Sequence, residues 1–506
     1  MNTPSVLKQY LAKTDVEAVD AALVSYLASL DLIAETSPLV ASSIVKELQD
    51  QRSYLKLIAS ENYSSIASQV AMGNLLTDKY SEGFAYHRFY AGCDNVDMIE
   101  KHANELACTL FGAENAYVQP HSGADANLIA YWAILNTRVQ VPALEEMGIK
   151  NPSDLSREDW NVIREKVGNQ RILGLDYYSG GHLTHGYRQN VSAQMFDAYS
   201  YSVSRETGLL DYDDIEKKAE EVKPLILLAG YSAYPRLINF RRMKEIADKV
   251  GAVFMVDMAH FAGLVAGKVM AGDYDPVKWA DVVTTTTHKT LRGPRGGMVL
   301  CKDEFAESLN KGCPLVIGGP LPHVMAAKAV AFTEALDDSF KTYSSKIVEN
   351  AKALAHYCSE LGMTIATGGT DNHLMLLDVR PFGINGRQGE SVLRECGVTL
   401  NRNSLPFDEN GPWYTSGLRI GTPAVTTLGM GEEQMKEIAQ IIHLVLSNTQ
   451  PGVITKGAKA GQKSRAKAVI ASEVKEEARA RVQKLLDAFV LYSSLDAELL
   501  AEYVQN

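Results

Sequence analysis

The sequence predicts an α/β fold in which a mostly parallel sheet is flanked by helices. Helical and strand patterns alternate through the centre of the chain, as in repeated strand–helix–strand units. The clearest unit is a helical stretch at 241–250, stopped by Gly251 and followed by an apolar strand at 252–256. Apolar or β-branched strands at 224–229 and 282–287 each lead into polar residues. Strand ends of this kind meet at one edge of a parallel sheet, where such folds bind ligands.

Composition indicates a large globular protein with at least two domains. Of 506 residues, 46% are hydrophobic and 22% charged, and the net charge of −11 argues against a polyanion binder. The six cysteines are scattered without CxxC pairs or metal-ligand spacing, which predicts reduced thiols in a cytoplasm and no metal. The chain has neither an apolar run of membrane-span length nor a signal-like start. We therefore expect no nucleic-acid or membrane partner.

Along the chain, an N-terminal arm is expected over residues 1–55. It would hold one helix near 16–30 and a second at 39–54, opened by Pro38 with Ser37 as N-cap. A large domain is expected over 56–325. Within it, the charged, mostly helical segment at about 137–171, with a capping box at Ser156/Asp159, predicts a solvated surface excursion.

From about Pro322 a long helical stretch is expected to lead into a smaller C-terminal α+β domain, residues 326–506. In this domain the segment 456–467 carries five basic residues and no acid among Gly and Ala. It predicts a flexible link rather than a nucleic-acid patch, because aromatic residues are absent. A last amphipathic helix is predicted over 473–492.

The most informative stretch is 282–297, because it places Lys289 at the end of a buried strand. A lysine there is costly unless its amine is neutralised, paired or used covalently. Asp257 ends another apolar strand. A Schiff-base lysine and a buried carboxylate on neighbouring strand ends suit a pyridoxal phosphate enzyme, because the carboxylate keeps the pyridine nitrogen protonated. A surface lysine and a helix-capping aspartate are the alternatives, which the pairing disfavours.

Two further patterns suit such an enzyme. A phosphate group needs backbone N–H groups at the start of a helix, and residues 121–124, which lead into the helical stretch 125–135, meet that need. The carboxylate of an amino-acid substrate needs a planar, bidentate donor. Arg419, within the apolar run GLRIGTPA, is the candidate.

Six motifs together resemble one family. In chain order they are LIASENY, GGHLTHG, VDMAHFAGLVA, TTTTHKTLRGPRGG, TGGTDNHL and GLRIGTPA. They resemble serine hydroxymethyltransferase, a fold-type I pyridoxal phosphate enzyme, and the resemblance runs from about Ser37 to about Leu446. It implies reversible transfer of the hydroxymethyl group of L-serine to tetrahydrofolate, giving glycine and 5,10-methylenetetrahydrofolate. Against the family, the segment 137–171 looks like an insertion beside the site.

The resemblance also implies residue roles within one chain. His182 stacks on the pyridine ring, and Ser232 and His260 lie near the cofactor hydroxyl. The cofactor set further contains Ser122, Gly123, Asp257, Thr286 and Lys289. Ser60 and Arg419 bind the substrate carboxylate. The folate side is implied to contain Tyr177, Gly181, Leu183 and Asn403.

The family further implies a homodimer with shared active sites. Glu82 would carry a proton at the substrate hydroxyl, with Tyr90 as a positioning or proton-transfer partner, both reaching into the neighbouring subunit's site. Tyr80 and Gly318-Gly319 would meet the cofactor from the same side. From the residues alone, an ordinary polar surface is an equal alternative for the segment 80–90.

Several positions depart from the family pattern. Phe89 stands where a Tyr is usual, Ala124 and Asp125 where Ser and Gln are, Tyr177 where Leu is, and Pro235 where Ser is. These departures concern the folate pocket and the phosphate contacts rather than the cofactor chemistry. Two alternative functions remain open: a folate-independent aldolase or racemase acting on 3-hydroxy or small amino acids, and a catalytically idle scaffold.

Overall fold

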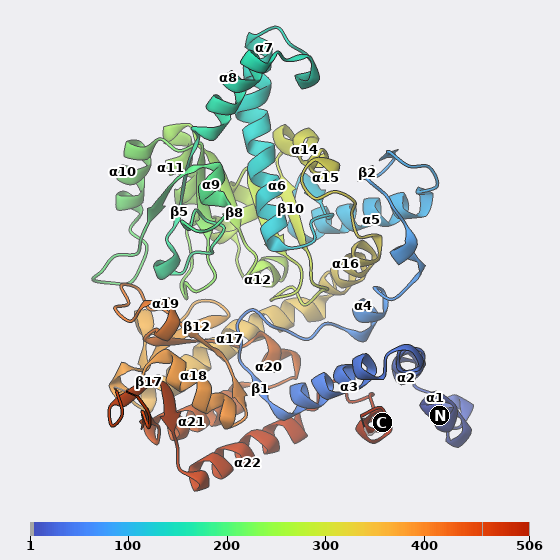
Figure 1. The fold of residues 1–506 in the computed structure, drawn as a ribbon, viewed down its shortest axis with the longest axis vertical. Helices are drawn as coiled ribbons and strands as arrows, with labels where there is room; N and C mark the ends of the chain where they lie inside the picture. The colour runs from blue at the N-terminus through green and yellow to red at the C-terminus, as the bar shows by residue number, and fades with distance from the viewer. Residues whose placement is uncertain (1–4, 458, 505–506) are drawn as a thin grey trace.

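The computed structural model describes residues 5–457 and 459–504. A large α/β domain lies above a smaller lobe in Figure 1, and the N-terminal helices lie beside the C-terminal end of the chain in that smaller lobe. In the described part of the chain, none of the helices combines the length and apolar character that crossing a bilayer requires.

The large domain is built on a seven-stranded sheet in the order β4-β10-β9-β8-β7-β5-β6. Only β10 runs against its neighbours, so the predicted, mostly parallel sheet is confirmed. The strands are β4 (Asn115–Tyr117), β5 (Arg171–Leu175), β6 (Asp197–Tyr201), β7 (Ile226–Gly230), β8 (Val253–Asp257), β9 (Val282–Thr286) and β10 (Gly297–Cys301).

Helices cover both faces of this sheet because successive strand residues point to opposite sides. Along β8, Phe254 and Val256 enter one core, whereas Val253 and Met255 enter the other. The first core is closed by α5 (Asp94–Phe111), α10 (Tyr212–Val222), α11 (Phe240–Val250) and α16 (Pro322–Ala335). The second is closed by α6 (Gly123–Leu135) and α14 (Asp303–Asn310).

The N-terminal arm contains α1 (Val6–Lys13), α2 (Ala21–Thr36) and α3 (Pro38–Ser53). The helix expected from residue 16 begins only at Ala21, because Asp20 caps it by accepting the Leu23 N–H at 2.8 Å. Ser37 occupies the N-cap position of α3 without a side-chain capping bond. Leu27 and Leu30 of α2 pack against Leu495 and Leu500, so the chain end completes the core of the arm.

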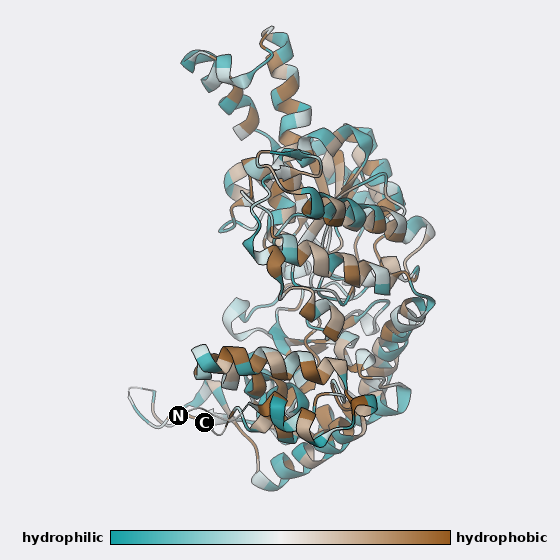
Figure 2. Cartoon of the chain, turned by 90° about the vertical axis from the view of Figure 1, so that its right-hand side faces the viewer, coloured by the Kyte–Doolittle hydropathy of each residue, from teal (hydrophilic) through white to brown (hydrophobic). Residues whose placement is uncertain are grey.

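The segment 137–171 forms two helices, α7 (Val141–Glu146) and α8 (Arg157–Gly168), that project from the large domain (Figures 1 and 2). Ser156 caps α8 by accepting the Asp159 N–H, as predicted. The expected position beside the site is wrong. The segment leaves from the C-terminal end of α6 and enters the start of β5, whereas the polar strand ends lie at the opposite edge of the sheet.

The smaller lobe is the predicted α+β domain. A four-stranded antiparallel sheet combines β11 (Thr364–Ile365), β12 (Leu374–Asp378), β15 (Gly417–Gly421) and β14 (Asn401–Asn403). It is flanked by α18 (Gly386–Glu395), α21 (Glu432–Ser447) and α22 (Ser472–Ala488). The long α17 (Asp338–Glu360) joins the lobes, since Ile347 lies in the large core and Leu354 in the small one.

Two expectations about the C-terminal region are corrected. The segment predicted as a flexible link contains part of a strand, because β17 (Lys463–Val469) pairs with β16 (Gln450–Val453) and its carbonyls accept hydrogen bonds from Asn385 and Gln388. Residue 458 lies outside the described residues. The helix expected to be the last, α22, ends at Ala488 rather than 492, and a further short helix, α23 (Ala497–Ala501), follows it. Between the two helices, the guanidinium of Arg52 donates to the carbonyl groups of Leu491 and Tyr492.

Candidate active site

Three parallel strands deliver polar side chains to one edge of the sheet. Asp257 is the last residue of β8, Ser232 lies two residues beyond β7, and Lys289 lies three residues beyond β9. The N-terminus of α6 meets the same edge, because Thr284 on β9 donates a hydrogen bond to Asn127 of α6 at 2.6 Å. The juxtaposition predicted from the strand ends is therefore present.

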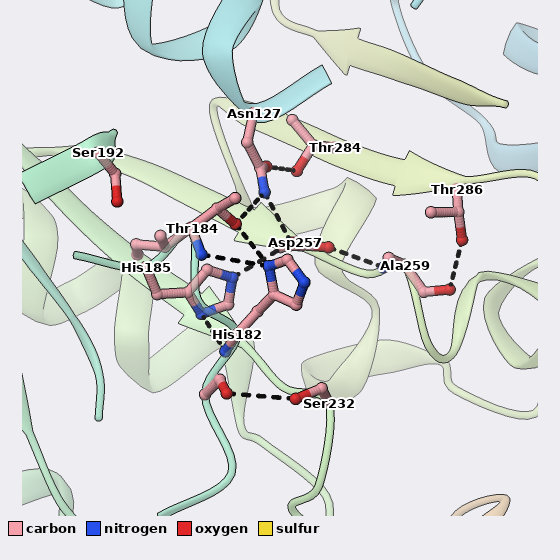
Figure 3. Close-up of polar contacts among 12 residues, drawn as sticks. Asn127, His182, Thr184, His185, Ser192, Ser232, Asp257, Ala259, Thr284 and Thr286 are labelled. Atoms are coloured by element: carbon pink, nitrogen blue, oxygen red, sulfur yellow. Dashed lines mark hydrogen bonds and ion pairs between the residues drawn. The ribbon is translucent and has the colours of Figure 1, made fainter. Parts of the chain in front are cut away.

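Asp257 is bonded through both of its carboxylate oxygens (Figure 3). One carboxylate oxygen accepts from Asn127 Nδ2 at 2.9 Å and lies 3.2 Å from His185 Nε2, and the other accepts the Ala259 N–H. His185 Nδ1 accepts the His182 N–H, which leaves Nε2 as the donor to Asp257. Burial favours the neutral acid, but the contacts with His185 outweigh it and hold the pKa of Asp257 well below its usual range. A fixed negative charge results.

His182 is held beside this carboxylate in neutral form. Its Nδ1 lies 2.7 Å from the Thr184 hydroxyl, which also accepts from Asn127 Nδ2 (Figure 3). Burial lowers the pKa of His182 to about 4, and Asp257 opposes that shift only in part. The ring is therefore a flat, uncharged, half-buried surface next to a buried anion, as stacking on a pyridinium requires.

Lys289 is half-buried, and its amine has no hydrogen-bond or ion-pair partner among residues 5–457 and 459–504. Burial lowers the pKa of Lys289 to about 8, with Asp257 opposing and Arg419 reinforcing the shift. With this pKa, the neutral amine, which is the nucleophilic form, is accessible near neutral pH. Its backbone is fixed by Asn62, whose amide donates to the Lys289 carbonyl at 2.9 Å.

Arg419 on β15 reaches this edge from the smaller domain. Its Nε donates to Asn401 Oδ1 at 3.0 Å and its Nη1 to the Ser232 carbonyl at 2.6 Å. Burial lowers the pKa of Arg419 to about 10. Within the described chain no carboxylate pairs with this guanidinium. A half-buried cation without its own anion suits a carboxylate ligand.

A second histidine pair closes the edge toward the smaller domain. His260 Nδ1 lies 3.2 Å from His373 Nε2, and both rings are buried. Burial lowers the pKa of His373 to about 3 and that of His260 well below its usual range. The Nδ1 atom of His373 has no partner in the described structure.

The start of α6 is the segment expected to bind a phosphate group. Ser122 is its N-cap and accepts the Asp125 N–H at 3.1 Å. A Cβ on Gly123 would lie 2.7 Å from Thr286 Cγ2, and one on Gly297 would lie 2.2 Å from the Ser122 carbonyl oxygen. Neither glycine position therefore has room for a side chain. The Thr286 hydroxyl donates to the Ala259 carbonyl.

Of the residues expected on the folate side, Tyr177 belongs to a cluster of tyrosines. Tyr177 packs against Tyr178 and Tyr187, with ring centroids 5.5 and 5.2 Å apart. Gly181 packs so tightly against the end of β5 that a Cβ added to it would lie 2.0 Å from the Leu175 carbonyl oxygen. Leu183 is 42% exposed. Ser60 is half-buried in a turn, and the Asn403 amide donates to the Ser404 carbonyl.

A second group of expected residues forms a separate, exposed cluster, the aromatic hairpin (residues 80–90). It contains β2 (Gly83–Phe84) and β3 (His87–Arg88), and its base is fixed by ion pairs from Arg88 to Asp97 and Glu100. Tyr80 and Tyr90 meet edge to face at 5.0 Å, and the Tyr80 ring lies against Gly319. Within the described chain no side chain of this hairpin contacts Lys289, Asp257 or Arg419.

Comparisons with known proteins identify the family. The family model described as serine hydroxymethyltransferase matches residues 33–148 and 160–442. Relatives called serine hydroxymethyltransferase come from Treponema pallidum (62% identical, covering 98% of this chain and 86% of the relative), Mycolicibacterium smegmatis (54%; 96% and 97%) and Chlamydia trachomatis serovar D (50%; 98% and 99%). The chain belongs to the serine hydroxymethyltransferase family. The residues 149–159 that the family model leaves out lie at the projecting tip of the segment 137–171.

As a serine hydroxymethyltransferase, the chain uses pyridoxal phosphate with tetrahydrofolate as co-substrate, and its amino-acid substrates are serine and glycine. The residues fit that cofactor. A partnerless amine at Lys289 suits the aldehyde, the charged Asp257 suits a protonated ring nitrogen, and the N-terminus of α6 suits a phosphate. His182, His185 and Asp257 also lie close enough to share a metal ion, but their hydrogen bonds already explain the arrangement. The expectation of no metal stays a prediction.

Sequence reasoning missed the residues that hold this serine hydroxymethyltransferase centre in place. They are Asn127, Thr184, His185, Thr284, His373 and Asn401. His185 and His373 lie inside the motifs GGHLTHG and TGGTDNHL, so the motifs contained a signal that was not used. Asn127 and Asn401 had none, because their partners are distant in the sequence.

Proposed function

We propose that the centre around Asp257, Lys289 and Arg419 is where this chain transfers the hydroxymethyl group of L-serine to tetrahydrofolate. The observation that carries the proposal is the arrangement of charge. One buried anion, Asp257, lies at the same sheet edge as the amine of Lys289, whose pKa is lowered, and the cation of Arg419, and neither of these two has a carboxylate partner in the described chain. An amino acid and an aldehyde cofactor with a basic ring nitrogen would together complement all three.

Within this proposal each side chain has one task. Lys289 holds the aldehyde, Asp257 holds the proton on the ring nitrogen, and His182 covers the ring face. When bound, pyridoxal phosphate supplies an electron sink for the bond broken at the substrate's α-carbon. Arg419 orients the carboxylate, with Ser60 as its proposed helper, so that the bond to be broken has one defined direction.

At the other end of the ring, Ser122, Gly123 and Thr286 are proposed to surround the phosphate, and Ser232 and His260 to lie at the cofactor hydroxyl. The Ser232 hydroxyl donates to the Gly181 carbonyl at 3.2 Å, so it would have to turn to serve that role. Tyr177, Gly181, Leu183 and Asn403 are proposed to line the folate side. Tyr177 lies near enough to Arg419 to oppose the lowering of the Arg419 pKa, which supports this position.

We further propose a cytoplasmic homodimer in which the aromatic hairpin completes the partner's site. Tyr80, Phe89 and Tyr90 are 57, 71 and 48% exposed, an unusual surface for large rings on a rigid base. Glu82 and Tyr90 would then act at the partner's substrate hydroxyl. Gly318 and Gly319 would reach the partner's cofactor beside Tyr80.

Borohydride reduction followed by peptide mapping tests the assignment of Lys289. The reduced cofactor should be attached to Lys289, and Lys289→Gln should remove both the attachment and the yellow colour while leaving far-ultraviolet circular dichroism unchanged. Serine cleavage should accelerate when tetrahydrofolate is added. Cofactor found on any other lysine would overturn the assignment.

A further inference from the structure

Lys328 of α16 is a buried lysine that the reaction described above does not use. Its side chain is 1% exposed, and its amine donates to three backbone carbonyls: Val118 at 2.6 Å, Gly297 at 2.8 Å and Pro120 at 3.0 Å. These three bonds use all three N–H groups of an ammonium ion, whereas a neutral amine offers only two. The geometry therefore describes a positive charge within the core.

This charge has no carboxylate partner among the described residues. Glu100 is the carboxylate that acts most strongly on the Lys328 charge, but it already forms an ion pair with Arg88 and accepts a hydrogen bond from the Gln119 amide. Burial lowers the pKa of Lys328 to about 7, and Glu100 and Asp125 oppose that shift only in part. A buried cation met only by carbonyl dipoles is costly, so an anion nearby would stabilise it.

The three carbonyls all belong to the walls of the proposed phosphate cradle. Val118 and Pro120 lie in the turn 118–122, which connects β4 to the N-cap Ser122 of α6. Gly297 begins β10, packs against the Ser122 carbonyl, and donates its N–H to Pro120. One ammonium group thus ties together the turn and the strand that flank the start of α6.

We propose that Lys328 is a positioning residue that holds the turn 118–122 in its phosphate-binding shape and whose charge strengthens phosphate binding from beneath the cradle. The inference rests on the proposed function, since it takes residues 122–123 as the phosphate site. Lys328 does not touch the aldehyde, the ring or the substrate, so its effect should be confined to the phosphate end of the cofactor.

Comparing two aldehydes isolates this effect. Pyridoxal phosphate and pyridoxal share the ring and the group that meets Lys289, and differ only in the phosphate. Full-length chain freed of cofactor should bind pyridoxal phosphate about tenfold or more weakly after Lys328→Met, because a charged, hydrogen-bonded group is lost. Its dissociation constant for pyridoxal should change less than about threefold. Lys328→Gln, which keeps two N–H donors, should fall between.

Phe332→Leu is the matched control. Phe332 lies one turn further along α16 and is fully buried, so the change loosens the same helix without touching the turn. It should leave the ratio of the two dissociation constants unchanged. An unchanged ratio in folded Lys328→Met or Lys328→Gln, or an equal loss for both aldehydes, would overturn the proposal.

Ser122→Ala separates this inference from the function on which it rests. If Ser122→Ala lowers the preference for pyridoxal phosphate and the Lys328 variants do not, the cradle is correctly placed and the role of Lys328 alone is wrong. If Ser122→Ala also leaves the preference unchanged, the phosphate lies elsewhere and both fail.

Discussion

The buried centre and the aromatic hairpin differ in what holds them. In the centre, Asp257 and His185 are bonded to neighbours of the same chain. In the hairpin, Arg88 and Gln119 hold the base, while Tyr86 and Phe89 are 60 and 71% exposed. The centre is thus preorganised by one chain, whereas the hairpin presents apolar area that a second chain could bury. Charge chemistry and the proposed subunit contact are therefore separated in the fold.

The largest expected effect tests that separation by mixing two inactive variants. Lys289→Gln damages the centre and Glu82→Ala the hairpin, so each homodimer should be inactive. A mixed dimer in which the hairpin serves the partner has one site that escapes both lesions, and activity should return. We expect recovery toward about a quarter of the wild-type rate after equal mixing, since about half the dimers are mixed and each has one intact site.

The control mixes Lys289→Gln with Asp257→Asn, two lesions of the same centre. Shared sites predict no recovery here, because in a mixed dimer each chain's own centre is damaged. Recovery in this control, or an active monomer in the first experiment, would contradict a hairpin that acts in trans.

A second difference is the response to acid. The pKa values of His182 and His373 in the centre are lowered to about 4 and 3, whereas an unfolded histidine titrates near 6.5. Between about pH 6.5 and 4 the unfolded chain binds more protons than the folded chain. The contribution of the two neutral histidines to the free energy of unfolding is therefore complete above pH 6.5 and is lost as the pH falls. The loss should be on the order of a few kcal/mol.

Thermal unfolding midpoints measured between pH 7.5 and 4.5 check the acid response. His373→Asn should flatten the decline, whereas His356→Asn on the exposed face of α17 should leave it unchanged. If the unfolding midpoint falls equally with pH in both variants, His373 also takes up a proton in the folded chain, and this prediction is wrong.

The third prediction tests whether Arg419 binds the substrate carboxylate. Arg419→Lys keeps the charge but loses the planar fork, because one ammonium nitrogen replaces the two nitrogens that bind Asn401 and Ser232. Serine affinity should fall by roughly 1–3 kcal/mol, or about 5- to 150-fold. Titration with serine, followed by the cofactor's absorbance, measures it. Arg402→Lys on the adjacent strand is the control, and unchanged binding in Arg419→Lys would place the carboxylate elsewhere.

How much was predictable depended on how each residue reaches the site. Asp257, Ser232 and Lys289 were predicted because parallel strands bring their carboxyl ends together whatever the loops do. Asn127 and Lys328 were not, because a helix face or a buried lysine has meaning only once its partners are known. The segment 137–171 was misplaced because a resemblance gives only the order of segments along the chain. The direction of α6 determines at which edge of the sheet the segment emerges, and that direction became known only from the structure.

The smallest expected effects concern positions where this chain departs from its family. Phe89 in the hairpin lacks a hydroxyl, and Tyr177 places a ring near Arg419 where the family has leucine. One hydrogen bond contributes about 0.5–1.5 kcal/mol, so each change should alter folate affinity roughly twofold to tenfold without abolishing the reaction. Folate-independent α-proton exchange or racemisation should accordingly be prominent in the wild type.

Phe89→Tyr and Tyr177→Leu should each tighten tetrahydrofolate binding and raise the ratio of folate-dependent serine cleavage to folate-independent α-proton exchange. Tyr86→Phe, at another exposed ring of the same hairpin, is the control and should change neither quantity. Because Phe89 would act in the partner's site and Tyr177 in its own, their effects should be measurable in separate subunits of a mixed dimer. If neither substitution changes folate affinity, these departures have no functional consequence, and the exposed hairpin tolerates aromatic exchange as an ordinary surface does.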